Sequence, residues 1–369
     1  MLIDYIKDVR HAEEEIFDAI KASPAPVVLF GAGESAWYNL TYLHYHGIEP
    51  VCICDNNPAK HGAHHLGLPV CSYDHFRNKI AAGKNKYHII ASVGTQYKDA
   101  IFSQLAAAHE KNPVWYLRGY EICGKKITRQ YILDHIAQFE EAHSSLADKI
   151  SKKVFVNVLN AKISGDYSLY EEIMTPTMYF DKDVVTLTEN EVLLDVGAYK
   201  GNGIVEFVKI TGAKYDAIIA FEPDKKTFAT LKNTVAKNGI KKVEPYNIGA
   251  WHKHASLCFH HGQEASSRLL ETAAAIFPNA AIEVDAIDNI LCGRRITYVS
   301  IDVEGAERNA ILGAEKTIKQ WKPKMAVCVY HRREDLFDIL LLLKSFMPKY
   351  KFYMRHYTNN QTETVLYAL

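Results

Sequence analysis

Short apolar runs alternate with segments of helical spacing along the whole chain. In its first third the apolar runs fall at residues 26–30, 51–54, 88–92 and 114–116, with helical segments such as 98–109 between them. Strands that alternate with helices are typical of a parallel sheet with helices on its faces. The pattern predicts a doubly wound, Rossmann-like α/β domain over residues 1–125, which begins with an amphipathic helix from about Leu2 to Ala22.

A second set of apolar runs fills the C-terminal half. Strands linked by helices are predicted at residues 192–196, 217–221, 243–246, 298–301 and 325–329. The last two runs, at 350–355 and 364–368, are separated by the turn signal Asn359–Asn360 and leave no room for a helix. They predict a terminal antiparallel hairpin. Residues 179–369 are therefore expected to form a second Rossmann-like domain. Residues 126–178 have helical spacing without a strand signal and are expected to form a helical connector.

A glycine-containing turn joins the first two strands of this second domain. Asp195 lies at the end of one apolar run, Gly197 and Gly201 follow it, and Glu222 closes the next run. This unit is typical of a site for a nucleoside-bearing cofactor. The carboxylate of Glu222 can accept hydrogen bonds from both hydroxyls of a ribose. Asp195 precedes the glycines, where an anion would repel a pyrophosphate but suits the ammonium group of S-adenosylmethionine. The turn therefore predicts a cofactor that supplies a methyl group.

Charge and apolar content narrow the classes of function. The chain has 43 basic and 43 acidic residues, whereas proteins that bind nucleic acid through its phosphates usually carry a basic surplus. No positively charged segment followed by an apolar core opens the sequence, and the longest aliphatic run, Ile339–Leu343, is too short to span a bilayer. We expect a cytoplasmic protein that acts on a small molecule, without nucleic acid or a membrane span. The sequence leaves room for a homo-oligomer.

The seven cysteines are scattered and odd in number, which indicates no disulfide framework. Cys52 and Cys54 alternate on a predicted strand and share one face. We interpret them as buried thiols rather than a metal pair, because no further cysteine or histidine lies at ligand spacing.

Several ordered motifs of the second domain resemble the FkbM family of S-adenosylmethionine-dependent methyltransferases. The motifs are Asp195–Gly201, Ser300–Glu307, Leu312–Glu315, Val329–Leu336, Tyr350–His356 and Glu363–Tyr367. The resemblance extends from about Leu146 to the C-terminus. It implies O-methylation of a hydroxyl, commonly on a sugar or a natural product.

The resemblance and the strand-end pattern together indicate which residues bind the cofactor. They are Asp195, Gly197, Ala198, Tyr199, Gly201, Glu222, Pro223, Asn247 and Asp302. One position departs from the family, in which an acidic residue often follows the second loop glycine, whereas this chain has Asn202. The change is harmless if the cofactor uses the backbone carbonyl there, and it weakens affinity if the cofactor uses a carboxylate.

Methyl transfer to an alcohol requires an aligned acceptor oxygen and benefits from a base that removes its proton. Asp302 and His331 end two predicted strands that are neighbours in this fold, so their side chains are expected to converge. We interpret His331 as the base and Asp302 as the group that orients it or the acceptor, and we assign no metal. Two alternatives stay open. His331 can anchor the start of the following helix, or Asp302, Glu304 and His331 can hold a divalent metal that binds the acceptor's hydroxyls.

The first domain carries a weaker motif. Gly31 and Gly33, with Asp55 after the next strand, meet the minimal dinucleotide fingerprint. The turn can also serve only for packing, or the domain can bind a nucleotide-sugar or position the acceptor. The favoured function is an S-adenosylmethionine-dependent O-methyltransferase that acts on a sugar, a nucleotide-sugar or a related metabolite. The alternatives are an NAD(P)-dependent sugar oxidoreductase and a non-catalytic binding protein.

Overall fold

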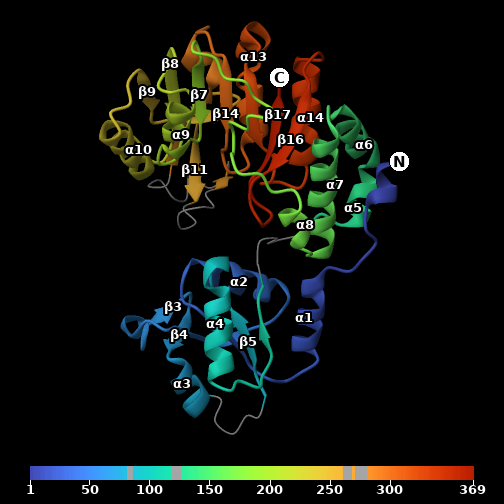
Figure 1. Cartoon of the computed structure of the whole chain (residues 1–369). Coiled ribbons are helices and arrows are strands. Elements are labelled where there is room, and N and C mark those ends of the chain that lie inside the picture. Colours follow the sequence, from blue (N-terminus) through green and yellow to red (C-terminus); the bar gives the residue numbers. More distant parts are fainter. Residues whose placement is uncertain (81–85, 118–125, 261–267, 271–280) are drawn as a thin grey trace. The chain divides into compact units, whose positions relative to one another are not determined.

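The computed structural model describes residues 1–80, 86–117, 126–260, 268–270 and 281–369, and the chain forms two compact units. The large unit contains Met1–Asp8, Ile127–Lys162 and Asp166–Leu369, and the small unit contains Val9–Lys126 and Ile163–Gly165 (Figure 1). Both are α/β, as the alternating pattern predicts. No helix in the described residues is both long and apolar enough to cross a bilayer.

The small unit is built on a mostly parallel sheet with the order β3-β4-β2-β1-β5-β6. The strands are β1 (Val27–Phe30), β2 (Pro50–Cys54), β3 (His64–His65), β4 (Leu68–Cys71), β5 (His88–Ala91) and β6 (Val114–Trp115). The principal helices are α1 (Ala12–Lys21), α2 (Glu34–Tyr45) and α4 (Thr95–Ala107). The residues of β1 and β5 are all buried, which explains why they read as continuous apolar runs.

The predicted helix over residues 2–22 is wrong, because the chain is extended in the middle of that segment. Leu2–Tyr5 is a short 3₁₀ helix, and α1 begins only at Ala12. Between them, the Lys7 N–H donates to Asn160 Oδ1 at 2.8 Å, and Asn160 Nδ2 donates to the Tyr5 carbonyl at 2.9 Å. The backbone at this point therefore bonds to a distant side chain in place of continuing the helix.

The large unit contains a sheet with the order β16-β17-β15-β14-β7-β8-β9. The strands are β7 (Val192–Val196), β8 (Ala217–Phe221), β9 (Val243–Tyr246), β14 (Tyr298–Ile301), β15 (Lys324–Cys328), β16 (Phe352–His356) and β17 (Thr364–Ala368). The final strand β17 is antiparallel to both of its neighbours, β15 and β16. The fold class is thus confirmed, including the terminal antiparallel hairpin.

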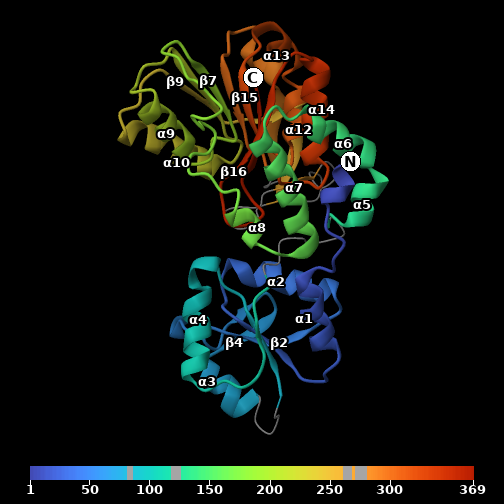
Figure 2. The same cartoon turned by 45° about the vertical axis from the view of Figure 1, so that its right-hand side comes forward.

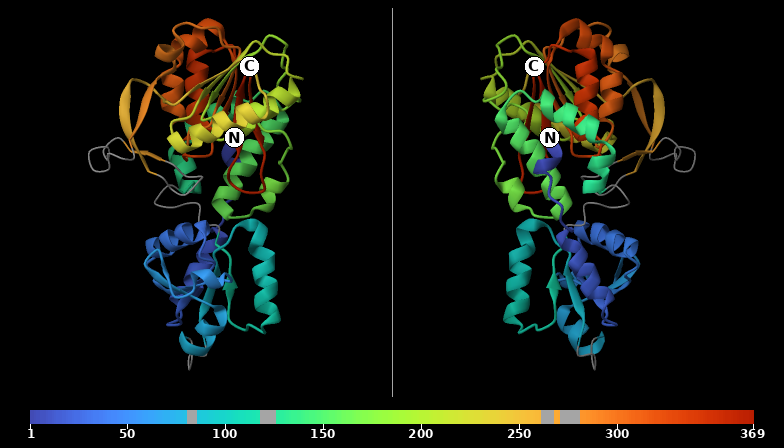
Figure 3. Two further views of the ribbon diagram at one scale, coloured as in Figure 1. Left: turned by 90° about the vertical axis from the view of Figure 1, so that its left-hand side faces the viewer. Right: turned by 90° about the vertical axis from the view of Figure 1, so that its right-hand side faces the viewer.

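Helices cover both faces of this sheet (Figure 3). The helices are α9 (Asn202–Ile210), α10 (Lys225–Lys237), α12 (Glu307–Leu312), α13 (Glu315–Trp321) and α14 (Asp335–Phe346). One core cluster joins Phe207 of α9 and Leu231 of α10 to alternate strand residues such as Leu193 and Tyr298. Because side chains alternate along a strand, Asp195 and Ser300 point to this same face.

The segment expected to be a connector packs as part of the large unit. It forms α5 (Arg129–Asp134), α6 (Ile136–Ser145), α7 (Lys149–Ser164) and α8 (Ser168–Glu171), with α6 next to α14 (Figure 2). The Met354 N–H of β16 donates to Ser151 Oγ at 2.9 Å, and Arg355 Nη2 lies 2.8 Å from Asp148 Oδ2. These contacts tie the helices to the edge of the sheet.

A second, smaller sheet follows β9. Its strands are β10 (Gly249–Trp251), β11 (Ala255–His260), β12 (Arg268–Leu270) and β13 (Ala281–Ala286), in the order β10-β13-β11-β12. It precedes α11 (Ile287–Leu291) and β14.

The turn after β7 requires a glycine at position 197. Gly197 has a φ of +85°, and a Cβ added to it would lie 1.8 Å from the Asp302 carbonyl oxygen. Gly212, after α9, has a comparable φ of +60°, but a Cβ added there would meet no atom within 4 Å. A comparison of substitutions at the two glycines therefore separates the free-energy cost of a left-handed backbone from the cost of a steric clash.

We expect Gly197→Ala to lower the free energy of unfolding by clearly more than Gly212→Ala. The left-handed backbone should cost Gly212→Ala about 1–2 kcal/mol, whereas Gly197→Ala must also push the loops after β7 and β14 apart. Chemical denaturation of both variants measures the difference. Equal losses would show that the close approach at Gly197 is unimportant.

Candidate functional site

The predicted polar side chains gather at the carboxyl ends of neighbouring strands in the large unit. Asp195 lies on β7, and Glu222, Asp302 and His331 follow β8, β14 and β15. The chain order reverses at β7, which lies between β14 and β8. In open α/β sheets, ligands bind outside the carboxyl ends of the strands at such a reversal.

Asp195 is buried and held by one neighbour across the sheet. Ser300 Oγ donates to its Oδ1 at 2.7 Å, and the two residues are register partners on β14 and β7. Burial raises the pKa of Asp195 to about 6, although the Ser300 hydrogen bond opposes this shift. Asp195 is only 8% exposed, so a ligand can contact its carboxylate only by entering the site between the strand-end loops.

Glu222 shapes the loop between β7 and α9. Its Oε2 accepts the Tyr199 N–H at 3.0 Å, and its Oε1 accepts the Asp224 N–H at 2.9 Å. Burial raises the pKa of Glu222 to about 7, against the effect of both hydrogen bonds. A carboxylate has about four acceptor positions, so each oxygen retains capacity for a further donor.

The other predicted cofactor residues surround this carboxylate. The Ala198 N–H donates to the Phe221 carbonyl at 2.9 Å, and Asn247 Nδ2 donates to the carbonyls of Glu222 and Pro223 at 2.8 and 3.0 Å. Tyr199 is 40% exposed and has a positive φ of 48°. The structure thus brings together the residues on the loops after β7, β8 and β9.

Gly201 and Asn202 form the start of helix α9. Gly201 is the N-cap, in a left-handed conformation, and no side chain caps the helix in its place. A Cβ on Gly201 would lie 2.9 Å from Leu231 Cδ1 of α10, so the glycine also permits close helix packing. Asn202, where the family often has an acid, is the first residue of the helix and is exposed.

His331 lies among carboxylates from the loop that follows β14. Its Nδ1 is 2.9 Å from Glu307 Oε1, and its Nε2 is 3.6 Å from Asp302 Oδ1 and 3.5 Å from Glu304 Oε2. The expected convergence of Asp302 and His331 therefore occurs. His331 and Glu307 are 10% and 0% exposed in their side chains, whereas Asp302 and Glu304 are 28% and 38% exposed.

These carboxylates control the charge of the imidazole. Burial alone would lower the pKa of His331, but Glu307, Asp302 and Glu304 raise it to about 10. Burial raises the pKa of Glu304 to about 7, although the imidazole lowers it in part. In this arrangement His331 carries a proton at neutral pH. A role as base requires that the imidazole first lose that proton.

Two residues that belong to the cluster were not assigned a role from the sequence. Glu307 opens α12, and its Oε1 also accepts the Val303 N–H at 3.0 Å, while Tyr179 Oη donates to Asp302 Oδ2 at 2.8 Å. Glu307 ends the motif Ser300–Glu307 that carries the family resemblance, and its place in that motif was the one sequence feature that pointed to a role in the site. Tyr179 precedes the first strand of the domain, and no sequence motif contains it.

The small unit places its fingerprint residues together but gives Asp55 internal partners. Asp55 Oδ2 accepts the Ala32 N–H at 2.7 Å, between Gly31 and Gly33, and pairs with Lys60 Nζ at 3.0 Å. Burial alone would raise the pKa of Asp55, but these contacts and the Asn57 N–H hold it below its usual value. The acid that a dinucleotide ribose would use already ties the glycine turn to the next loop.

Cys52 and Cys54 are buried, as expected, and a third thiol joins them. Cys71 on β4 is the register partner of Cys54 on β2, and the three sulfurs lie within 4.8 Å of one another. This neighbour is distant in sequence, so spacing did not reveal it.

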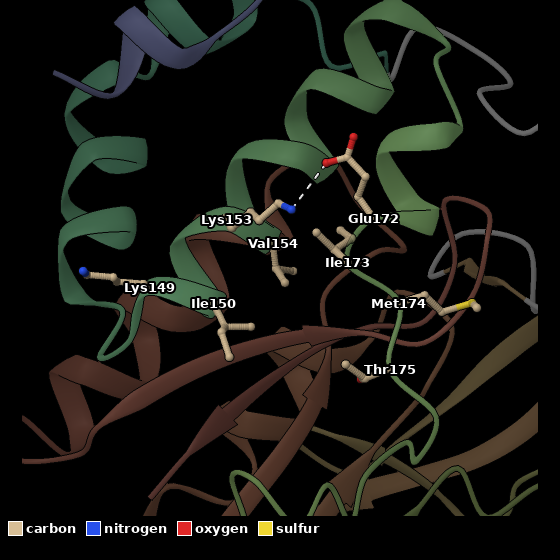
Figure 4. A pocket seen from close by; sticks show the side chains of 8 residues that line it. All are labelled: Lys149, Ile150, Lys153, Val154, Glu172, Ile173, Met174 and Thr175. Atoms are coloured by element: carbon tan, nitrogen blue, oxygen red, sulfur yellow. Dashed lines mark ion pairs between the residues drawn. The ribbon is translucent and has the colours of Figure 1, made fainter.

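A separate cavity of about 370 Å³ lies in the large unit, between α7 and residues 172–175 (Figure 4). Its lining includes Ile150, Val154 and Met174, with an ion pair between Lys153 and Glu172 at 3.4 Å. None of its lining residues belongs to the strand-end set.

Known proteins resemble part of this chain in sequence and the whole of it in fold. Residues 195–352 match the family model described as the methyltransferase FkbM domain. A crystal structure of a methyltransferase FkbM from Methylobacillus flagellatus aligns over 100% of this chain and 95% of its own, with 22% identity and a TM-score of 0.75, which shows a shared fold. An rRNA methylase from Streptococcus thermophilus aligns over 49% of this chain and 87% of its own, with 13% identity and a TM-score of 0.33. The search of curated proteins gave no match.

Proposed function

We propose that this chain transfers a methyl group from S-adenosylmethionine to a hydroxyl of a small acceptor, a proposal supported by the match of residues 195–352 to the model of the methyltransferase FkbM domain. We propose a sugar, a nucleotide-sugar or a related metabolite as the acceptor. The observation that carries the proposal is the pair of buried carboxylates, Asp195 and Glu222, on either side of the glycine turn at the strand reversal.

The residues at the ends of β7, β8 and β9 fit this cofactor in chemistry. Glu222 retains acceptor capacity for the two ribose hydroxyls, and Asp195 offers an anion to the ammonium group, directly or through a water. Both carboxylates are desolvated, so a cationic ligand stabilises their ionised forms. We propose that Gly197, Ala198, Tyr199, Gly201, Pro223, Asn247 and Asp302 complete the binding site.

Catalysis then depends on positioning and on the acceptor's proton. When bound, S-adenosylmethionine supplies a methyl group already activated on a sulfonium sulfur. We propose Asp302 and His331 as the catalytic residues on the acceptor side, since Asp302 follows the strand beside β7 and its carboxylate is partly exposed. Their task is to hold the hydroxyl and to assist the departure of its proton.

The affinity for the cofactor tests the role of Glu222. Alanine would remove the acceptors of both the Tyr199 and the Asp224 N–H groups, whereas glutamine keeps one acceptor oxygen, so Glu222→Gln is the milder change. We expect Glu222→Gln to weaken S-adenosylmethionine binding at least tenfold in calorimetry, because charge-assisted hydrogen bonds are worth about 1.5–3 kcal/mol each. The partly exposed Glu206→Gln on α9, whose carboxylate pairs only with Lys209 at the surface among the described residues, serves as the control.

The same titration has a pH signature. Glu222 ionises as pH rises through about 7, so wild-type affinity should increase between pH 6 and 8. The Glu222→Gln variant should lack most of this increase. Unchanged affinity at pH 8 in Glu222→Gln would remove Glu222 from the ribose site.

The small unit is proposed to bind a nucleotide or to help position the acceptor, and Asp55 tests this. We expect Asp55→Ala in the full-length protein to leave S-adenosylmethionine affinity unchanged while lowering thermal stability, because Asp55 holds Ala32 and Lys60. Titration with NADH, followed by its fluorescence, checks the alternative. Saturable NADH binding that Asp55→Ala abolishes would favour the oxidoreductase.

A further inference from the structure

We propose that Asp302, Glu307 and His331 form a binding site for a divalent cation that holds two neighbouring hydroxyls of the acceptor. The cation site is inferred from the contacts of these three residues alone. Its use in catalysis rests on the proposed methyl transfer. It specifies the acceptor class as a vicinal diol or a similar chelating pair of oxygens.

The geometry of the three side chains permits a shared ion. One ligand atom from each of Asp302, Glu307 and His331 lies within 4.8 Å of the other two. Asp302 comes from the loop after β14, Glu307 is the first residue of α12, and His331 lies in the segment after β15. Carboxylate oxygens with one imidazole nitrogen suit a hard or borderline divalent ion such as Mn²⁺.

The charge of the cluster also favours a cation. Asp302, Glu304 and Glu307 all lie within 4.0 Å of the same imidazole, and among the described residues no lysine or arginine pairs with any of the three. One imidazolium thus faces several carboxylates, so the cluster lacks positive charge.

An independent observation is that buried polar atoms of the cluster lack partners. Glu307 is fully buried, and its Oε2 has no hydrogen-bond partner. His331 Nε2 likewise has no hydrogen-bond partner, whereas Nδ1 lies 2.9 Å from Glu307 Oε1. Buried polar groups are normally satisfied, so these atoms point to a ligand.

A cation at this position would change how the hydroxyl is activated. It would bind the acceptor oxygen and lower the pKa of its hydroxyl, while His331 acts as a ligand and not as the base. The proton passes to Glu304, whose carboxylate is the more exposed one and lies 3.5 Å from His331 Nε2. The O–CH₃ bond then forms as the S–CH₃ bond breaks, and its electron pair stays on sulfur.

Mn²⁺ binding to the full-length protein tests the site. After treatment with a chelator and its removal, we expect electron paramagnetic resonance at pH 7.5 to show one saturable Mn²⁺ site. Glu307→Gln and the less buried Asp302→Asn should each weaken it at least tenfold, whereas the surface variant Glu315→Gln should not. Calorimetry in buffers of different ionisation enthalpy should show release of about one proton on binding, because a ligand histidine must be neutral.

The outcomes separate the two proposals. If the wild type shows no saturable Mn²⁺ binding, or if Glu307→Gln and Asp302→Asn bind as the wild type does, the cation site is wrong and the imidazolium alone balances the carboxylates. S-adenosylmethionine binding, titrated separately, is unaffected by that result. If Mn²⁺ binds as expected but S-adenosylmethionine does not bind, the cation site stands and the proposed function fails.

Discussion

The close approach of Gly197 to the Asp302 carbonyl is the contact on which the rest of the site depends. It is allowed only because residue 197 has no Cβ, and the Asp302 N–H, which donates to the Val196 carbonyl at 2.9 Å, joins the same two loops. β7 and β14 are neighbours where the strand order reverses. The proposed cofactor residues after β7 and the proposed acceptor residues after β14 therefore start from one shared backbone contact.

Desolvation of acidic side chains is the second constraint. Burial raises the pKa of Asp195 to about 6 and that of Glu222 and Glu304 to about 7. Holding these groups ionised costs free energy, which His331 offsets only in part at Glu304 and which no positive partner among the described residues offsets at Asp195 or Glu222. A cationic cofactor on one side of β7, and a cation on the other side, would each supply the missing charge. The two proposals thus answer the same electrostatic requirement in adjacent parts of one sheet edge.

The sequence predicted the parts of the site that depend on local pattern. Strand ends are recognisable from apolar runs, and parallel strands bring their carboxyl ends to one edge, so Asp195, Glu222, Asp302 and His331 could be placed together. Glu307 was not assigned a role from the sequence. The backbone turns at Glu304 and Gly305, which have φ values of +54° and +94°, and this turn brings the Glu307 carboxylate to His331. Its contact depends on that backbone path, which spacing does not show.

Contacts between distant segments account for the other differences. The break in the first predicted helix depends on Asn160, and the third thiol of the cluster, Cys71, depends on the register of β2 and β4. The charge of His331 is a property of several side chains brought together from two loops, so no single motif predicts it. The histidine was predicted to lie beside Asp302, and it does, while its protonation followed only from the assembled cluster.

A crystal structure of the full-length protein with S-adenosylhomocysteine would test the central claim most directly. The account predicts that the ribose hydroxyls lie on Glu222, that the amino acid portion lies towards Asp195, and that the ligand's sulfur faces Asp302 and His331. A ligand bound elsewhere in the chain, or a ribose placed away from Glu222, would contradict it.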